Sequence, residues 1–141
     1  MRVKISVLLV LIVTAAFSTK LYGGQADHPH KSPHGGIVQD AEGMHLEFLL
    51  DKSGEPKLFL YDKAMKPIER SDLEAKVAIK GHGGVENTQA LKFSKDAKEG
   101  PVFKGEPVKG LSDWETAVVS IKMKDDWKNI RFTRHSAGHG H

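Results

Sequence analysis

Short segments of alternating apolar and polar residues, separated by turn residues, constrain the fold of this chain more than any other feature. A period of two residues is typical of β-strands with one buried face, whereas amphipathic helices need a period near 3.6. Groups rich in Asp and Gly, such as 40–43 and 51–54, separate several segments and favour tight turns. The pattern predicts strands at 36–39, 44–51, 57–61, 75–80, 88–94, 102–104, 115–123 and 130–133.

Seven or eight short strands in about 100 residues predict an all-β fold. The expected architecture is an antiparallel β-sandwich, immunoglobulin-like or cupredoxin-like, or a small barrel of seven or eight strands. The chain has no cysteine, so a hydrophobic core and not disulfides must stabilise it. The alternation places the following residues in that core: Leu46, Phe48, Leu50, Leu58, Leu60, Val77, Ile79, Leu91, Phe93, Val119 and Ile121.

The first 26 residues have the layout of a secretory signal peptide with a helical apolar segment. Arg2 and Lys4 precede an apolar run over 5–17, and Gly24 and Ala26 put small residues where a signal peptidase reads them. The run is shorter than the ~20 residues that a membrane-spanning helix needs. We therefore expect cleavage after Ala26, a periplasmic or secreted mature chain, and no membrane span in that chain.

The charge of the chain does not favour nucleic acid as a partner. There are 21 Lys and Arg against 18 Asp and Glu, but Arg2, Lys4 and Lys20 all lie in the predicted signal peptide, which contains no acid. The mature chain is therefore close to neutral when its histidines are uncharged, and its lysines are spread along the sequence. It lacks the basic patch that phosphate backbones require.

Histidine is concentrated near the two ends of the mature chain. Of eight histidines, three precede the first predicted strand and three follow the last: His28, His30 and His34, and His135, His139 and His141. Imidazole is the commonest metal ligand in proteins, so such tracts favour binding of a transition metal ion, Cu or Zn foremost. The alternative is two solvated tails whose histidines are incidental.

The predicted organisation is a flexible tail over 27–33, a β-sandwich domain over 34–135 and a flexible tail over 136–141.

A more ordered candidate lies in the predicted strand 44–51. His45 and Glu47 share the strand face opposite the core, with Cα atoms about 6.6 Å apart, so both side chains can reach one ion. Glycines at 35 and 36 allow the backbone to fold His34 toward them. We predict a site of His34, His45 and Glu47 with one position left for a further ligand. The alternative is a solvent-exposed polar face on which the imidazole is incidental.

His82 begins a second His-Gly-Gly sequence and is a further candidate ligand. The segments that follow the two His-Gly-Gly sequences do not align, so the repetition gives little indication of duplication. The alternative is that Gly83 and Gly84 serve only a turn that requires positive φ.

Four short motifs follow one another in the first half of the mature chain. They read His34-Gly-Gly-Ile-Val, Gly43-Met-His-Leu-Glu-Phe-Leu, Leu58-Phe-Leu-Tyr-Asp and Lys66-Pro-Ile. Over about residues 34–68 the chain resembles a family of small exported β-domains. Such domains occur as stand-alone proteins, and they resemble the N-terminal extension of some periplasmic adaptor subunits of heavy-metal efflux systems. The resemblance implies a periplasmic domain associated with metal resistance, in which His34, His45 and Glu47 match the motif. The chain has no room for the adaptor's helical hairpin and barrel.

Two functions are consistent with these patterns, and an enzyme is not expected. The first is a periplasmic metal-binding protein, a buffer or carrier for a borderline metal such as Cu or Zn, associated with heavy-metal efflux or resistance. The second is a non-catalytic module that docks on an efflux-system component and has no specific metal site. The sequence has no Cys nucleophile, nucleophile elbow, phosphate-binding loop or zinc-protease helix motif.

Overall fold

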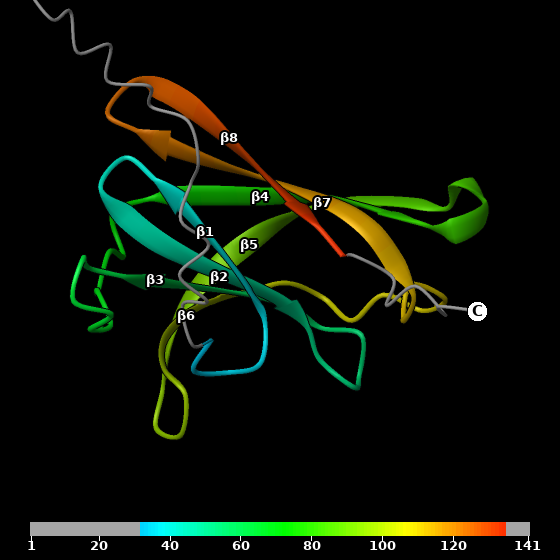
Figure 1. Cartoon of the computed structure of the whole chain (residues 1–141), viewed down its shortest axis with the longest axis horizontal. Coiled ribbons are helices and arrows are strands. Elements are labelled where there is room, and N and C mark those ends of the chain that lie inside the picture. The colour runs from blue at the N-terminus through cyan, green and yellow to red at the C-terminus, as the bar shows by residue number, and fades with distance from the viewer. Residues whose placement is uncertain (1–31, 135–141) are drawn as a thin grey trace, which may run out of the picture.

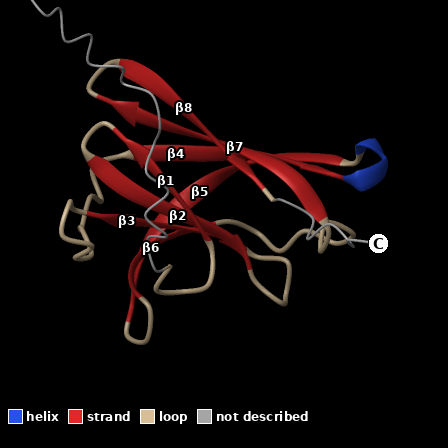
Figure 2. Ribbon diagram, in the orientation of Figure 1, coloured by secondary structure: helices blue, strands red, loops and turns tan. Residues whose placement is uncertain are grey.

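The computed structural model describes residues 32–134, which form an all-β fold (Figures 1 and 2). The strands are β1 (Ile37–Ala41), β2 (Met44–Leu50), β3 (Pro56–Tyr61), β4 (Glu74–Gly81), β5 (Glu86–Asp96), β6 (Gly100–Lys104), β7 (Trp114–Met123) and β8 (Asp126–Thr133). A short 3₁₀ turn, η1 (His82–Gly84), joins β4 to β5. Each predicted strand has a counterpart, so the all-β prediction is confirmed. The predicted signal peptide, residues 27–31 of the first tail and the whole second tail lie outside the described residues.

The strands form one antiparallel sheet in the order β1-β2-β3-β6-β5-β4-β7-β8. Strand β5 pairs with β4 through residues 86–91 and with β6 through residues 92–96, so it belongs to both halves of the sheet. The edge strands β1 and β8 approach each other, but no backbone ladder joins them in the described part of the chain. The sheet is therefore a nearly closed, barrel-like structure. No helix within residues 32–134 is long and apolar enough to span a membrane.

The main core lies between the two halves of the sheet and is built from alternate residues of each strand. In β4, for example, Ala75, Val77 and Ile79 are buried while the residues between them are exposed. All the predicted core residues belong to this core, with Leu50 and Phe93 partly buried at its edge. Aromatic rings link the two halves: the ring centroid of Phe48 lies 5.4 Å from that of Trp114 and 5.5 Å from that of Phe132. Every residue that the alternation placed in the core therefore lies in it or at its edge, and the core also contains residues outside that list, such as Phe103, Trp114 and Phe132.

Strand β3 is buried on both faces, and this creates a second apolar cluster outside the main core. Phe59 and Tyr61 point away from Leu58 and Leu60, and they pack with Val102 of β6. A continuous apolar run is typical of a strand covered on both sides. The outer face of β2 and β3 is therefore covered and not open to water.

The register of the first three strands brings the candidate residues together. The β1–β2 turn has positive φ at Glu42 (52°) and Gly43 (77°), as a two-residue type I′ hairpin turn requires. It pairs Asp40 with His45, and β2 in turn pairs His45 with Tyr61 and Glu47 with Phe59. These residues consequently share one face of the sheet.

The turn between β5 and β6 is held by Asp96, whose carboxylate is unusually acidic. Its Oδ1 accepts the N–H groups of Lys98 (2.7 Å) and Glu99 (3.2 Å), and its Oδ2 accepts Lys104 Nζ (3.1 Å). These bonds, the Lys98 N–H first, lower the pKa of Asp96 from 3.8 to about 2. Because the folded value lies below the unfolded one, the ionised group stabilises the fold above pH ~4, and this contribution is lost as the pH falls toward ~2.

Asp96→Asn is expected to flatten the dependence of the free energy of unfolding on pH between about 4 and about 2. The Asn carbonyl still accepts the backbone N–H groups, so the turn is retained while the titrating group is removed. Denaturant midpoints measured from neutral pH down to this range check the slope. Asp125→Asn, at an exposed position in the next hairpin turn, is the matched control and should leave the slope unchanged. An equal slope in all three proteins would contradict the assignment.

Candidate functional site

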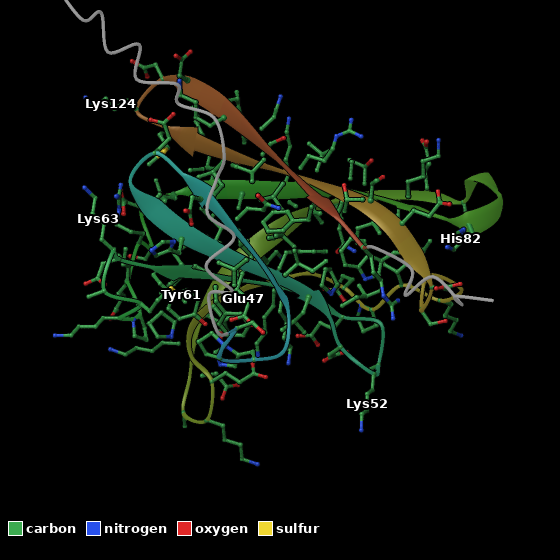
Figure 3. The ribbon with its side chains drawn as sticks, viewed as in Figure 1. Glu47, Lys52, Tyr61, Lys63, His82 and Lys124 are labelled. Carbon is green, nitrogen blue, oxygen red and sulfur yellow. The ribbon has the colours of Figure 1, made fainter. Side chains whose placement is uncertain are left out.

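The candidate site is a hydrogen-bonded group of His34, Glu47 and Tyr61 on the outer face of β2 and β3. His34 precedes β1 and folds across this face, where it meets Glu47 of β2 and Tyr61 of β3. Figure 3 shows Glu47 and Tyr61 close together in the middle of the molecule. The predicted approach of His34 to Glu47 is therefore observed.

Glu47 is fully buried, with an exposed fraction of 0%, and both carboxylate oxygens are satisfied. Oε1 accepts the backbone N–H groups of His34 (2.9 Å) and Gly36 (2.8 Å). Oε2 accepts the Tyr61 hydroxyl (2.7 Å) and lies 3.2 Å from His34 Nδ1. The interpretation of this strand face as solvent-exposed is thus wrong at Glu47, because the His-Gly-Gly segment and β3 cover it. A buried carboxylate is tolerated only with such a full set of donors.

The two glycines after His34 are required by this close approach. Gly35 has φ +77°, which disfavours other residues. At Gly36 an added Cβ would lie 2.6 Å from the Phe48 carbonyl oxygen and 2.8 Å from Glu47 Cγ. Only a residue without a side chain lets the backbone reach the carboxylate. The His-Gly-Gly motif therefore allows the backbone N–H groups of His34 and Gly36 to bind Glu47.

The His34 ring is fixed by contacts on one edge and one face. Nδ1 lies 2.9 Å from the Tyr61 hydroxyl, and the ring stacks on Phe59 with centroids 3.8 Å apart and planes inclined by 6°. Since the Tyr61 hydroxyl donates to Glu47, it accepts from Nδ1–H, which assigns the proton of the neutral ring to Nδ1. Nε2 then carries the lone pair and makes no hydrogen bond within residues 32–134. With a side chain 29% exposed, the ring is reachable from solvent.

Tyr61 is a permanent hydrogen-bond donor in this group. Burial raises the pKa of Tyr61 far above its usual range, and the bond to the Glu47 carboxylate raises it further. A phenol that does not ionise keeps its O–H and donates it to the Glu47 carboxylate across the physiological range. Tyr61 therefore serves to hold the carboxylate and the imidazole in place.

His45 lies on the same face but has a different partner. Its Nδ1 contacts Asp40 Oδ1 of β1, and its side chain is 12% exposed. The shared strand face with Glu47 is confirmed by the pairing of both residues with β3. Within residues 32–134, however, no three His, Asp or Glu side chains form a group that can hold a metal ion.

Of the remaining predicted ligands, the structure describes only His82, which is not part of this group. His82 lies in η1 at the tip of the β4–β5 hairpin, where Gly83 and Gly84 have positive φ as a turn requires. The other five fall outside the described residues: His28, His30, His135, His139 and His141.

Tyr61 and Phe59 are the site residues that the sequence reasoning missed. The apolar run 57–61 was read as a strand with one core face, whereas four consecutive large apolar residues signal two covered faces. A face covered on β3 implies a covered face on the neighbouring strand, and this would have indicated that Glu47 is buried.

The chain matches no family model, no curated protein and no solved structure. Its function must therefore be inferred from the chemistry of its own residues.

Proposed function

We propose that this chain is an exported metal-binding protein, a periplasmic buffer or carrier for a borderline transition metal such as Cu or Zn. The ordered ligand is Nε2 of His34. The observation that carries the proposal is the contact of His34 Nδ1 with the Glu47 carboxylate and the Tyr61 hydroxyl, at 3.2 and 2.9 Å. Histidines that ligate metals in proteins commonly donate the other ring N–H to a carboxylate, which fixes the tautomer and raises the basicity of the ligating nitrogen.

Glu47 acts in this proposal as a positioning residue and not as a direct ligand. Each of its oxygens already lies within bonding distance of two donors, and the side chain has no exposed surface. A metal ion bound to Glu47 itself would have to displace backbone N–H groups that hold the chain against β2. Orientation of the imidazole is the role that keeps those bonds.

Further ligands come from histidines near His34. His45 occupies the same strand face, two residues from Glu47, and His30 precedes His34 by four residues, a reach of at most ~14 Å along an extended chain. His28 lies just beyond. A site that combines the fixed His34 imidazole with further imidazole ligands suits reversible loading, which is the requirement of a buffer or carrier. The association with heavy-metal efflux rests on the resemblance of the His-Gly-Gly and His-x-Glu motifs.

Removal of the His34 imidazole tests the proposal. In the chain starting at Asp27, His34→Ala is expected to weaken the tightest Zn²⁺ or Cu²⁺ binding step by at least about tenfold. Loss of a residue that only orients a metal-ligating histidine typically lowers metal affinity by about this factor, and loss of the ligand itself should cost no less. Isothermal titration with each metal ion measures the change. Glu47→Gln should weaken the same step less, because the amide oxygen still accepts the two backbone N–H groups.

Asp125→Asn is the matched control for these titrations, because it removes an exposed carboxylate in the β7–β8 turn, away from His34. It should leave the metal affinity unchanged. The proposal is overturned if His34→Ala keeps the affinity and stoichiometry of the parent chain while its circular dichroism shows an intact fold.

A further inference from the structure

The outer side of β5, β4, β7 and β8 is a positively charged surface, which we call the basic face. Strands β4, β7 and β8 lie side by side in the upper half of Figure 1. Alternate residues of the four strands point away from the core: Glu74, Lys76, Ala78 and Lys80 of β4; Glu86, Thr88, Ala90 and Lys92 of β5; Thr116, Val118, Ser120 and Lys122 of β7; Trp127, Asn129, Arg131 and Thr133 of β8. Five Lys or Arg and two Glu give the basic face a charge of +3. Strand pairing therefore gathers cations that are spread along the sequence.

Little of this positive charge is neutralised within the part of the chain that the structure describes. Of the five cations, only Lys122 forms an ion pair there, with its Nζ 3.4 Å from Glu74 Oε1. Lys76 Nζ instead lies 4.3 Å from the centroid of the Trp127 ring, a cation–π contact. The other three side chains are exposed without such a contact: Lys80, Lys92 and Arg131. The basic face therefore presents its charge to an anionic partner.

Trp127 gives this face an exposed aromatic ring at one end. Its side chain is 41% exposed, and within residues 32–134 only Val85 is another large apolar residue of comparable exposure. Indole combines an apolar body with a polar N–H, and tryptophan is accordingly enriched where water meets an apolar phase. The combination of cations and an exposed indole is typical of surfaces that contact lipid headgroups.

We propose that the basic face docks the protein on the surface of an anionic phospholipid bilayer. The Lys and Arg side chains bind the lipid phosphates, and the indole of Trp127 lies at the level of the headgroups. Each basic side chain near such a surface contributes about 1 kcal/mol, which corresponds to about a fivefold increase in the partition coefficient. This inference does not rest on the proposed metal binding.

The distribution of charge favours a bilayer over a protein partner. Protein interfaces commonly have an apolar centre from which charged residues are depleted, with a polar rim around it. On the basic face each of the four strands carries a cation, and the residues between the cations are small, such as Ala78 paired with Val118. Trp127 lies on the edge strand β8 and not at the centre. A bilayer presents phosphates over its whole surface, so it matches this arrangement.

The contact between Lys76 and Trp127 disfavours a nucleic acid. Proteins that bind single strands stack the bases on exposed aromatic rings. One side of the Trp127 ring is already occupied by the Lys76 ammonium, 4.3 Å from the ring centroid, and a stacked base would have to displace it. Lipid phosphates can bind the same ammonium without removing it from the ring.

Tryptophan fluorescence tests the docking, because the two tryptophans differ in exposure. Trp114 is 5% exposed and Trp127 41%, so acrylamide quenches mainly Trp127. The chain starting at Asp27 is used, because it lacks the apolar run over 5–17 that would bind lipid by itself. At low salt and with a chelator present, vesicles of phosphatidylglycerol and phosphatidylcholine are expected to shift the emission to shorter wavelength and to reduce the quenching. Trp127→Phe should abolish both changes.

The same titration contains its electrostatic controls. Vesicles of phosphatidylcholine alone should produce neither change, and 1 M NaCl should reverse both, because it shortens the Debye length to about 3 Å. Unaltered emission together with no cosedimentation on phosphatidylglycerol vesicles at low salt would overturn the inference. Because the chelator removes metal ions, this result and the titrations of His34→Ala fail independently of each other.

Variants then locate the binding surface. The double variant Lys80→Gln, Arg131→Gln should lower the partition coefficient measured by cosedimentation by about 25-fold, from about fivefold for each cation. The matched control, Lys52→Gln with Lys63→Gln, removes the same charge from exposed turns after β2 and β3 and should lower it no more than about twofold. Equal losses in the two double variants would show that binding follows net charge alone, and would overturn the role of the basic face.

Soluble polyanions test the choice of a bilayer as the partner. Heparin and duplex DNA are titrated at the same low salt and followed by the emission of Trp127. If either one shifts the emission while phosphatidylglycerol vesicles do not, the basic face binds a soluble polyanion and the bilayer proposal is overturned.

Discussion

Glu47→Ala is expected to lower the free energy of unfolding of the metal-free protein by about 3 kcal/mol. The substitution leaves the N–H groups of His34 and Gly36 and the Tyr61 hydroxyl without their acceptor, and it opens a cavity in a fully buried position. Unsatisfied buried donors cost about 1–3 kcal/mol each, although the segment before β1 can detach and recover part of this from water. Guanidinium unfolding with a chelator present measures the change.

Two comparisons make the result specific to the buried carboxylate. Glu47→Gln should cost clearly less, because its amide oxygen still accepts the two backbone N–H groups. Glu74→Ala removes an exposed carboxylate that lies 3.4 Å from Lys122, and such surface pairs contribute about 0–1 kcal/mol. If Glu47→Ala were as stable as Glu74→Ala, the hydrogen bonds to the Glu47 carboxylate would contribute nothing to the free energy of unfolding.

This stability effect also constrains how the metal titrations are interpreted. If Glu47 both fastens the chain and orients His34, its loss should reduce stability and metal affinity together, whereas His34→Ala should reduce mainly the affinity. In His34→Ala the backbone N–H of residue 34 still reaches Glu47, so both backbone hydrogen bonds to the carboxylate are kept. A structural role alone would leave the affinity of both variants near that of the parent chain.

Phe48→Ala is expected to destabilise the protein by about 4 kcal/mol, in the range typical of large-to-small changes at buried aromatic positions. Phe48 is fully buried in β2 and packs against Trp114 and Phe132, so its ring connects the two halves of the sheet. Phe132 is paired with Ala117, and Trp114 is paired with Gly81, so neither ring can readily move in to fill the space. Chemical denaturation followed by tryptophan fluorescence measures the loss.

Val85→Ala serves as the control for this cavity, because Val85 is 49% exposed and lies in the β4–β5 connection. It should change stability by no more than about 0.5 kcal/mol. A loss at Phe48 of less than about 1 kcal/mol would mean that the two halves of the sheet do not depend on this contact.

The sequence by itself determined the strands and which of their residues face the core. Because side chains two residues apart in a strand share a face, the apolar alternation identifies the buried face. Asp and Gly residues indicate where a strand ends in a turn. These are local properties, so all eight strands and every predicted core residue were found without knowledge of the fold. The glycines after His34 also allowed the histidine to fold back toward β2, because they free the backbone from side-chain constraints.

Tertiary structure alone decided what covers each face and which distant residues meet. Alternation cannot distinguish a polar face in water from a polar residue under another segment. It placed Glu47 on the face opposite the core, and only the tertiary structure shows that Glu47 is buried beneath His34 and beside Tyr61. The contacts of His82 with Asp113 and Glu115 join residues more than thirty positions apart. They depend on β4 and β7 being neighbours in the sheet, and strand order is fixed by the joint packing of all strands rather than by any one segment.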